Sequence, residues 1–121
     1  MADLNGKVAL ITGGGQGVGL GIGLALSAAG ASVVLAGRTL DKVEKAAAEI
    51  VARGGKAVAV ACNVKDSGDL AAIVDHAVTT FGALDILVNN AQEVPLGPLE
   101  EVSDEAFLAG FESGPLATFR L

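Results

Sequence analysis

Five glycines within seven positions near the start of the chain could bind a phosphate group through the backbone. They are Gly13, Gly14, Gly15, Gly17 and Gly19. An apolar run precedes them at residues 8–11 and an apolar segment of helical length follows, which predicts a strand, a tight turn and a helix. The first amides of a helix have no intrahelical partner and carry partial positive charge, so this segment is typical of a dinucleotide site. The alternative is a tight turn that binds no ligand. Such a turn does not need five glycines, each of which loses much conformational entropy on folding.

The spacing of the glycines gives three of them different tasks. Gly13 permits the tight turn, Gly17 leaves room for a pyrophosphate, and Gly19 lets the helix lie close to the sheet. The pattern is Thr-Gly-x-x-x-Gly-x-Gly, which differs from the generic Gly-x-Gly-x-x-Gly but meets similar physical requirements. The candidate cofactor-binding residues of this segment are Gly13, Gly15, Gln16, Gly17, Val18 and Gly19.

A basic residue stands where the second strand is expected to end. The apolar run 32–36 is followed by Gly37 and Arg38, and the next carboxylate is Asp41, which is expected in the following helix. An NAD site needs an acidic side chain at this strand end to bind the ribose 2′-hydroxyl, whereas a guanidinium pairs with a 2′-phosphate. Arg38 therefore favours NADP(H) over NAD(H). The alternative is a solvated arginine that only flanks a helix.

The elements that must position these residues alternate along the chain. Short apolar runs predict strands at residues 8–11, 32–36, 57–61 and 84–88. Helices are expected after the glycines, over 40–53 and 69–81, and from Ser103, whose hydroxyl can cap the fourth. This alternation predicts an α/β fold, a Rossmann-type doubly wound parallel sheet with right-handed crossovers. Residues 1–121 then form one dinucleotide-binding domain, which we expect to be the front part of a longer fold because the fourth strand leaves an open edge.

Composition excludes several other classes of protein. The net charge of −6 argues against nucleic acid or an anionic membrane as the main partner, because both require a basic surface. No apolar stretch approaches the roughly 18 residues of a membrane span, and the first residues lack a secretion signal. A single cysteine, Cys62, excludes an internal disulfide framework and fits the reducing cytoplasm.

Metal and hydrolase chemistry find no support in the spacing of polar residues. The acidic residues Glu93, Glu100, Glu101, Asp104 and Glu105 are scattered over an expected loop, 93–105, and a helix start, so we interpret them as solvated side chains. His76 is expected at the surface, and Cys62 as a small buried hydrophobe. No serine has a base at a diagnostic spacing.

Three segments together resemble the short-chain dehydrogenase/reductase family. The segment 12–19 resembles the family's cofactor motif, residues 85–91 (Asp-Ile-Leu-Val-Asn-Asn-Ala) resemble its second signature, and residues 62–64 resemble its Asp-Val element beside the adenine. The likeness spans essentially the whole chain, in the family's order and spacing. It implies hydride transfer between NADP(H) and a carbonyl, alcohol or related substrate, and adds Asn63, Val64 and Asn90 to the cofactor-binding candidates. For Asn90 a purely structural role, tying neighbouring loops together, is an equal alternative.

The chain also departs from the family pattern. Gln92 stands where the family usually has glycine, and Asn63 replaces an aspartate, although its amide can still accept a hydrogen bond. Gly114 stands where the fourth helix of the family carries an auxiliary asparagine, and Pro115 is expected to kink that helix. The family's catalytic Ser and Tyr-x-x-x-Lys lie further along than residue 121, so no catalytic residue is assigned in this chain.

The resemblance implies further properties of an intact protein. Its substrate is a small molecule, and it is a homodimer or homotetramer. Because fold does not determine function, a non-catalytic nucleotide-sensing or interaction protein on the same scaffold is the alternative to an enzyme.

Overall fold

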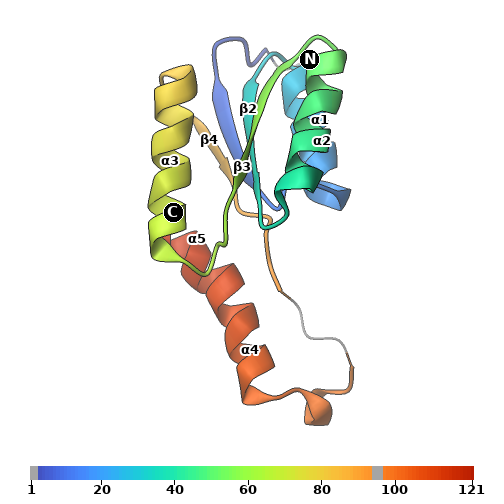
Figure 1. The fold of residues 1–121 in the computed structure, drawn as a ribbon, viewed down its shortest axis with the longest axis vertical. Helices are drawn as coiled ribbons and strands as arrows, with labels where there is room; N and C mark the ends of the chain where they lie inside the picture. Colours follow the sequence, from blue (N-terminus) through green and yellow to red (C-terminus); the bar gives the residue numbers. More distant parts are fainter. Residues whose placement is uncertain (1–2, 94–96) are drawn as a thin grey trace.

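The computed structural model describes residues 3–93 and 97–121 and contains a parallel sheet with helices on both sides (Figure 1). The strands are β1 (Val8–Thr12), β2 (Ser32–Gly37), β3 (Lys56–Ala61) and β4 (Ile86–Val88). The helices are α1 (Gly17–Ala28), α2 (Leu40–Ala52), α3 (Ser67–Phe81), α4 (Asp104–Phe111) and α5 (Ala117–Arg120), with a 3₁₀ turn η1 (Leu99–Glu101) and a π-helical turn η2 (Glu112–Leu116). The expected α/β architecture is confirmed.

The strand order β3-β2-β1-β4 creates a switch point beside β1. All three strand pairs are parallel, and Ile11 in β1 pairs with Leu35 of β2 on one side and Val88 of β4 on the other. The chain therefore proceeds outward from β1 to β3 and then returns to the opposite side of β1. In open parallel sheets, a ligand binds at the carboxyl ends of the strands where the order reverses in this way.

Alternate residues of the central strands enter two separate cores. Ile11, Val33 and Leu35 pack with side chains of α1 and α2, whereas Leu10 and Val34 pack with side chains of α3. Figure 1 shows the same layers, with α3 on one face of the sheet and α1 and α2 on the other. Because both faces are covered, the strands are continuous apolar runs without polar alternation.

Helix ends follow the residues that can cap them. The side chain of Asp66 accepts a hydrogen bond from the amide of Asp69 (2.9 Å), and α3 therefore begins at Ser67, two residues before the expected start. The same helix ends at Gly82, whose φ of 87° is the left-handed conformation that favours glycine. Gly54, directly after the cap of α2, has a φ of 89°. The expected ends of these two helices, at residues 53 and 81, thus directly precede glycines in the left-handed conformation.

The fourth strand is shorter than expected because the side chain of Asp85, and not only its backbone, bonds to the neighbouring strand. We predicted a strand over 84–88, but β4 comprises only Ile86–Val88. The carboxylate of Asp85 accepts a hydrogen bond from the amide of Val8 (2.9 Å), and the amide of Asp85 donates to the Val8 carbonyl (2.9 Å). The strand-like bonding at residue 85 is therefore partly made by a side chain.

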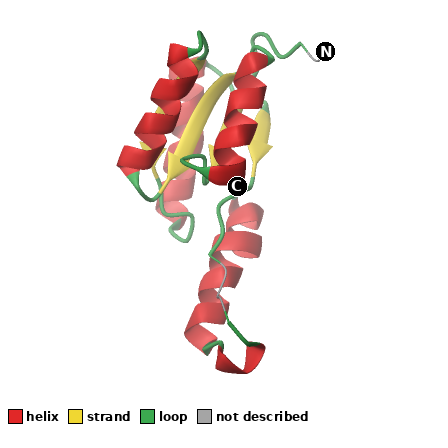
Figure 2. Cartoon of the chain, turned by 90° about the vertical axis from the view of Figure 1, so that its right-hand side faces the viewer, coloured by secondary structure: helices red, strands yellow, loops and turns green. Residues whose placement is uncertain are grey.

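After β4 the chain leaves the sheet, and the elements η1, α4, η2 and α5 (residues 99–120) form what we call the helical arm (Figures 1 and 2). The Ser103 hydroxyl caps α4 by accepting from the Ala106 amide (3.1 Å), as predicted. Gly114 and Pro115, where we expected a kink, lie in the π turn η2, and the flanking residues keep right-handed helical angles. Part of the predicted loop 93–105, residues 94–96, lies outside the described residues, and its later part contains η1. Among the described residues, no helix combines the length and apolarity needed to cross a membrane.

Candidate functional site

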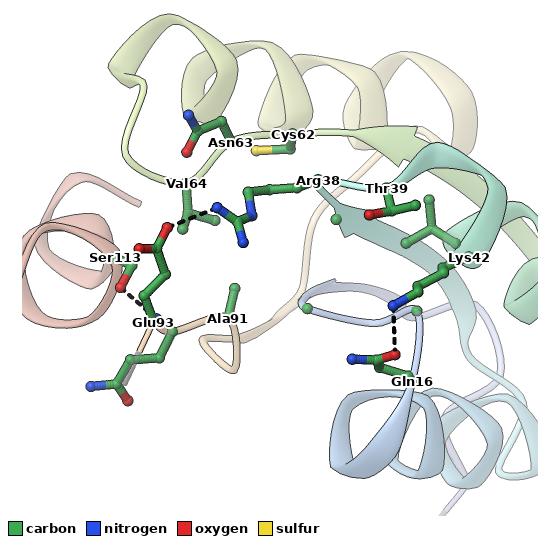
Figure 3. A pocket seen from close by; sticks show the side chains of 15 residues that line it. Gln16, Arg38, Thr39, Lys42, Cys62, Asn63, Val64, Ala91, Glu93 and Ser113 are labelled. Carbon is green, nitrogen blue, oxygen red and sulfur yellow. Dashed lines mark hydrogen bonds and ion pairs between the residues drawn. The ribbon is translucent and has the colours of Figure 1, made fainter. Parts of the chain in front are cut away.

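A pocket of about 250 Å³ lies at the carboxyl ends of the strands, beside the switch point. Its wall comes from the loops that follow β1, β2, β3 and β4, together with the start of α2 and η2 (Figure 3). Six of the predicted residues line it: Gly13, Gly15, Gln16, Arg38, Asn63 and Val64. Four others, Gly17, Val18, Gly19 and Asn90, are not part of this wall.

The glycine loop is tied to the sheet at its beginning and open at the helix start. The amides of Gly13 and Gly14 both donate to the Ala36 carbonyl of β2 (2.8 and 3.2 Å), so they do not face a ligand. Leu20 makes the first intrahelical bond, to the Gln16 carbonyl (3.3 Å), and the amides of residues 17–19 therefore have no such acceptor. The amides of this segment that could contact an anion are therefore those of residues 17–19, and not those of Gly13 and Gly14.

Gly13 and Gly17 adopt the backbone conformation that glycine permits. Their φ angles are 67° and 57°. A Cβ atom at Gly13 would lie 2.8 Å from the side-chain nitrogen of Asn90, whereas one at Gly17 would meet nothing within 4 Å. The space over Gly17 is therefore open, as a close approach by a ligand requires.

Gly19 performs a different task from the one we predicted. It is buried, and a Cβ there would collide with the carbonyl oxygen of Gly13 and lie 2.6 Å from the side-chain nitrogen of Asn90. The missing side chain therefore lets α1 approach the glycine loop, not the sheet. Close approach to the sheet occurs one turn later, at Gly23, whose Cβ would lie 3.2 Å from the Leu35 side chain and 3.5 Å from that of Ile11.

Asn90 makes the hydrogen bonds of the structural role that we considered for it. Its backbone amide donates to the Thr12 hydroxyl (3.1 Å), and its side-chain nitrogen donates to the Gly13 carbonyl (3.0 Å). These bonds tie the end of β4 to the end of β1. Val18, at the start of α1, projects into solvent and is 72% exposed.

The guanidinium of Arg38 forms an ion pair that the sequence did not indicate. Its Nη1 lies 2.8 Å from Oε1 of Glu93, and Nζ of Lys65 lies 2.8 Å from the same oxygen. The hydrogen bond from Lys65, reinforced by the charges of Lys65 and Arg38 against a smaller effect of burial, lowers the pKa of the Glu93 carboxyl. Our interpretation of Glu93 as a merely solvated acid is therefore wrong. Its place in the loop that follows the fourth strand was the available signal, because parallel strands end at one edge of the sheet.

Asn63 and Val64 form the wall at the end of β3. The Asn63 side-chain oxygen accepts from the Lys65 amide (3.0 Å), and the side-chain nitrogen is a further group that could contact a ligand. Val64 is nearly buried and also belongs to the core beside α3. A further basic residue, Lys42, lines the pocket and donates to the Gln16 side chain (3.1 Å). No motif in the sequence pointed to Lys42, because it lies on α2 and comes to the loop only through folding.

Cys62 lies at the inner wall of the pocket as a protonated thiol. It is 2% exposed, and burial, with the negative charges of Asp69 and Asp66, raises its pKa from 9.0 to about 11. Within residues 3–93 and 97–121, no three side chains of the metal-binding types form a cluster.

The chain matches a family model and many known proteins. The model described as short chain dehydrogenase matches residues 7–121. A cyclohexanol dehydrogenase of Acinetobacter sp. (strain SE19) is 48% identical over 87 residues, which are 72% of this chain and 35% of that protein. A short-chain type dehydrogenase/reductase from Mycobacterium marinum superposes with a TM-score of 0.91 at 34% identity, over 98% of this chain and 48% of that one. A 7α-hydroxysteroid dehydrogenase solved with NADH and a steroid gives 0.91 at 35%, over 98% and 46%. The chain thus spans half or less of the length of these proteins.

Proposed function

Since the chain belongs to the short-chain dehydrogenase family, whose named members here are oxidoreductases, we propose that the intact protein is an NADP(H)-dependent oxidoreductase. It would transfer a hydride between the nicotinamide cofactor and a carbonyl, alcohol or related small-molecule substrate. The observation that supports this best is the pocket at the switch point, where the glycine loop and Arg38 face the same space. In this proposal residues 1–121 are a single dinucleotide-binding domain.

The residues present fit such a cofactor in shape and charge. Gly17 leaves the helix start uncovered, and a Cβ at Gly13 or Gly19 would fill space that the loop itself needs. We propose that the first amides of α1, including those of Gly17, Val18 and Gly19, hold a pyrophosphate. Gly13, Gly15 and Gln16 would shape the loop beneath it, with Asn90 holding that loop in place.

The remaining candidates would surround the adenosine end. Arg38 would pair with a 2′-phosphate, the Asn63 amide would contact the adenine, and Val64 would form the apolar wall beside it. When bound, the nicotinamide supplies or accepts the hydride. The residues of this chain bind and orient the cofactor, and none of them is assigned an acid–base role.

The preference for NADP(H) rests on the end of β2. That strand ends at Gly37 and is followed by Arg38, and the first carboxylate after it, Asp41, lies in the first turn of α2. The related 7α-hydroxysteroid dehydrogenase was solved with NADH, so the family by itself does not decide the cofactor. The charge at this strand end supports NADP(H), because a guanidinium binds a phosphate in a bidentate manner and gains little from a hydroxyl.

Replacement of Arg38 tests this proposal directly. In Arg38→Gln of the intact protein, we expect the affinity for NADPH to fall roughly tenfold and that for NADH to stay nearly constant, since one charge-assisted interaction is lost. Both dissociation constants are measured by fluorescence titration. Arg53→Gln is a matched control, because Arg53 is similarly exposed (65% against 63%) and forms one ion pair, with Glu49, away from the pocket. Tighter binding of NADH than of NADPH to the unmodified protein would contradict the proposal.

A nucleotide-sensing protein is the second candidate. The observation in its favour is Gly114, which offers no side chain where the resemblance places an auxiliary asparagine. Oxidation of NADPH by the intact protein with a panel of ketones separates the two candidates. Turnover supports the enzyme, whereas binding without turnover supports the sensor.

Assembly and location belong to the same proposal. We propose a homodimer or homotetramer in the cytoplasm, without nucleic acid or membrane as a partner. Large exposed apolar side chains on the arm, such as Phe107 (64%) and Phe119 (86%), support association, and the free buried thiol of Cys62 suits a reducing compartment.

A further inference from the structure

One carboxylate oxygen lies between two cations that come from different strands. Glu93 follows β4, Arg38 follows β2, and Lys65 follows β3, yet Nη1 of Arg38 and Nζ of Lys65 both lie 2.8 Å from Oε1 of Glu93. Figure 3 shows the Glu93 carboxylate reaching the Arg38 guanidinium across the pocket. The carboxylate oxygen of Glu93 thus already contacts the guanidinium that we propose binds the 2′-phosphate.

The backbone of Glu93 is itself fixed. Its amide donates to the hydroxyl of Ser113 (2.7 Å), which is 2% exposed, and that hydroxyl donates to the Gly110 carbonyl (3.3 Å). Because the helical arm holds residue 93 in this way, its carboxylate is presented to the two cations rather than free to turn into solvent. The carboxyl is ionised at neutral pH, and its lowered pKa favours the ionised form further.

We propose that Glu93 is a specificity-determining residue, an internal carboxylate that competes with the 2′-phosphate of NADP(H) for Arg38 and Lys65. This inference rests on the proposed function. A phosphate that approaches Arg38 meets the negative charge of Glu93 and must displace it or share its partners. The 2′-hydroxyl of NAD(H) carries no charge and meets no such repulsion. Glu93 therefore reduces the preference for NADP(H) that Arg38 alone would give.

The competing account assigns Glu93 a supporting role. There the carboxylate would hold the guanidinium in the orientation that a phosphate needs, so its loss would weaken binding. The two accounts predict opposite signs for one substitution. Lys65 distinguishes them further, because only competition releases a second cation for the phosphate.

The test uses Glu93→Gln in the intact protein, with titration of NADPH and NADH. Competition predicts that the affinity for NADPH rises about twofold to fivefold, the range expected for one partly exposed charge pair. The affinity for NADH should stay constant, and the gain for NADPH should shrink at high ionic strength because of screening. Glu49→Gln is the matched control, since it removes the carboxylate of another exposed ion pair, 2.9 Å long, on α2.

Lys65→Gln, made alone and together with Glu93→Gln, provides a second measurement. The lysine should contribute more to NADPH affinity when Glu93 is absent, which a double-mutant cycle detects. Weaker NADPH binding in Glu93→Gln, or equal changes for both cofactors, would overturn this inference. If the unmodified protein binds neither cofactor, the proposed function fails. If it binds both and the ratio stays the same in the variant, only the role of Glu93 fails.

Discussion

The hydroxyl of Thr12 connects β1 and β4, whose ends border the pocket. It accepts hydrogen bonds from the amides of Asn90 and Ala91 (both 3.1 Å) and donates to the Val88 carbonyl (3.4 Å). Thr12 is 2% exposed, so its hydroxyl has little access to water and would lose free energy without these partners. A single buried side chain thus holds the end of β1 against the end of β4, next to the loop that we assign to the pyrophosphate.

Cys62 gives a prediction about pH at the same scale. Its pKa is raised from 9.0 to about 11, so the folded state retains the proton in a range where the unfolded state loses it. The contribution of this thiol to the free energy of unfolding is constant below pH 9 and falls between pH 9 and about 11.

The burial of the same thiol predicts its reactivity. We expect slow alkylation of Cys62 by iodoacetamide at pH 7.5 in the native protein and fast alkylation in urea, measured on its peptide by mass spectrometry. Equal rates in both states would contradict this burial.

Single residues of the site differ in how far the sequence reveals them. Arg38 was predictable because strand ends in a parallel sheet define the crevice, and its position in the chain specifies its place in space. Glu93 was not, since the sequence shows a charge in a loop but not the two cations that folding brings to it. Lys42 was not predicted either, because its contact with the glycine loop depends on how α2 packs.

At the scale of elements, α1 offers a comparison between two of its glycines. A Cβ at Gly19 would collide with the Gly13 carbonyl, whereas one at Gly21 would meet nothing within 4 Å. We expect Gly19→Ala to lower the free energy of unfolding by about 1–3 kcal/mol and to weaken cofactor binding, because the loop must move. Gly21→Ala should raise it by about 0.5–1 kcal/mol, since alanine stabilises a helix interior.

Urea unfolding and NADPH titration of both variants in the intact protein measure these effects. Gly21→Ala is the control for the helical preference of alanine itself. A Gly19→Ala variant that is as stable as Gly21→Ala would show that α1 does not approach the loop as closely as described.

The order and type of elements were predictable, but their contacts were not. Apolar runs and terminating glycines placed the first three strands and the ends of α2 and α3, because burial on both faces and left-handed caps leave local patterns. The fourth strand was predicted too long, since the bond from the Val8 amide to the Asp85 carboxylate depends on the neighbouring strand. For the same reason, close packing on the sheet was assigned to Gly19 and belongs to Gly23.

At the scale of the whole molecule, the sheet and the arm differ in how they bury apolar surface. The strands and α1–α3 enclose two cores, while α4 extends away from the sheet (Figure 2). Several large apolar side chains of α4 are exposed. Phe107, Leu108 and Phe111 belong to α4, and the exposed side chains of Leu99 in η1 and Phe119 in α5 lie before and after it in the chain. Exposed apolar groups gathered on one segment favour association, because contact removes them from water.

The arm therefore predicts how the 121-residue chain behaves when it is produced alone. We expect it to sediment at micromolar concentration with a mass above that of a monomer, or to unfold over a broad temperature range. Phe107→Ser combined with Phe111→Ser should shift the sedimentation towards the monomer, because it removes two half-exposed or exposed rings from α4. Val51→Ser is the control, since Val51 is 53% exposed on α2, away from the arm. A sharp monomeric transition of the unmodified chain would contradict the prediction, and an equal effect of Val51→Ser would place the association elsewhere than on the arm.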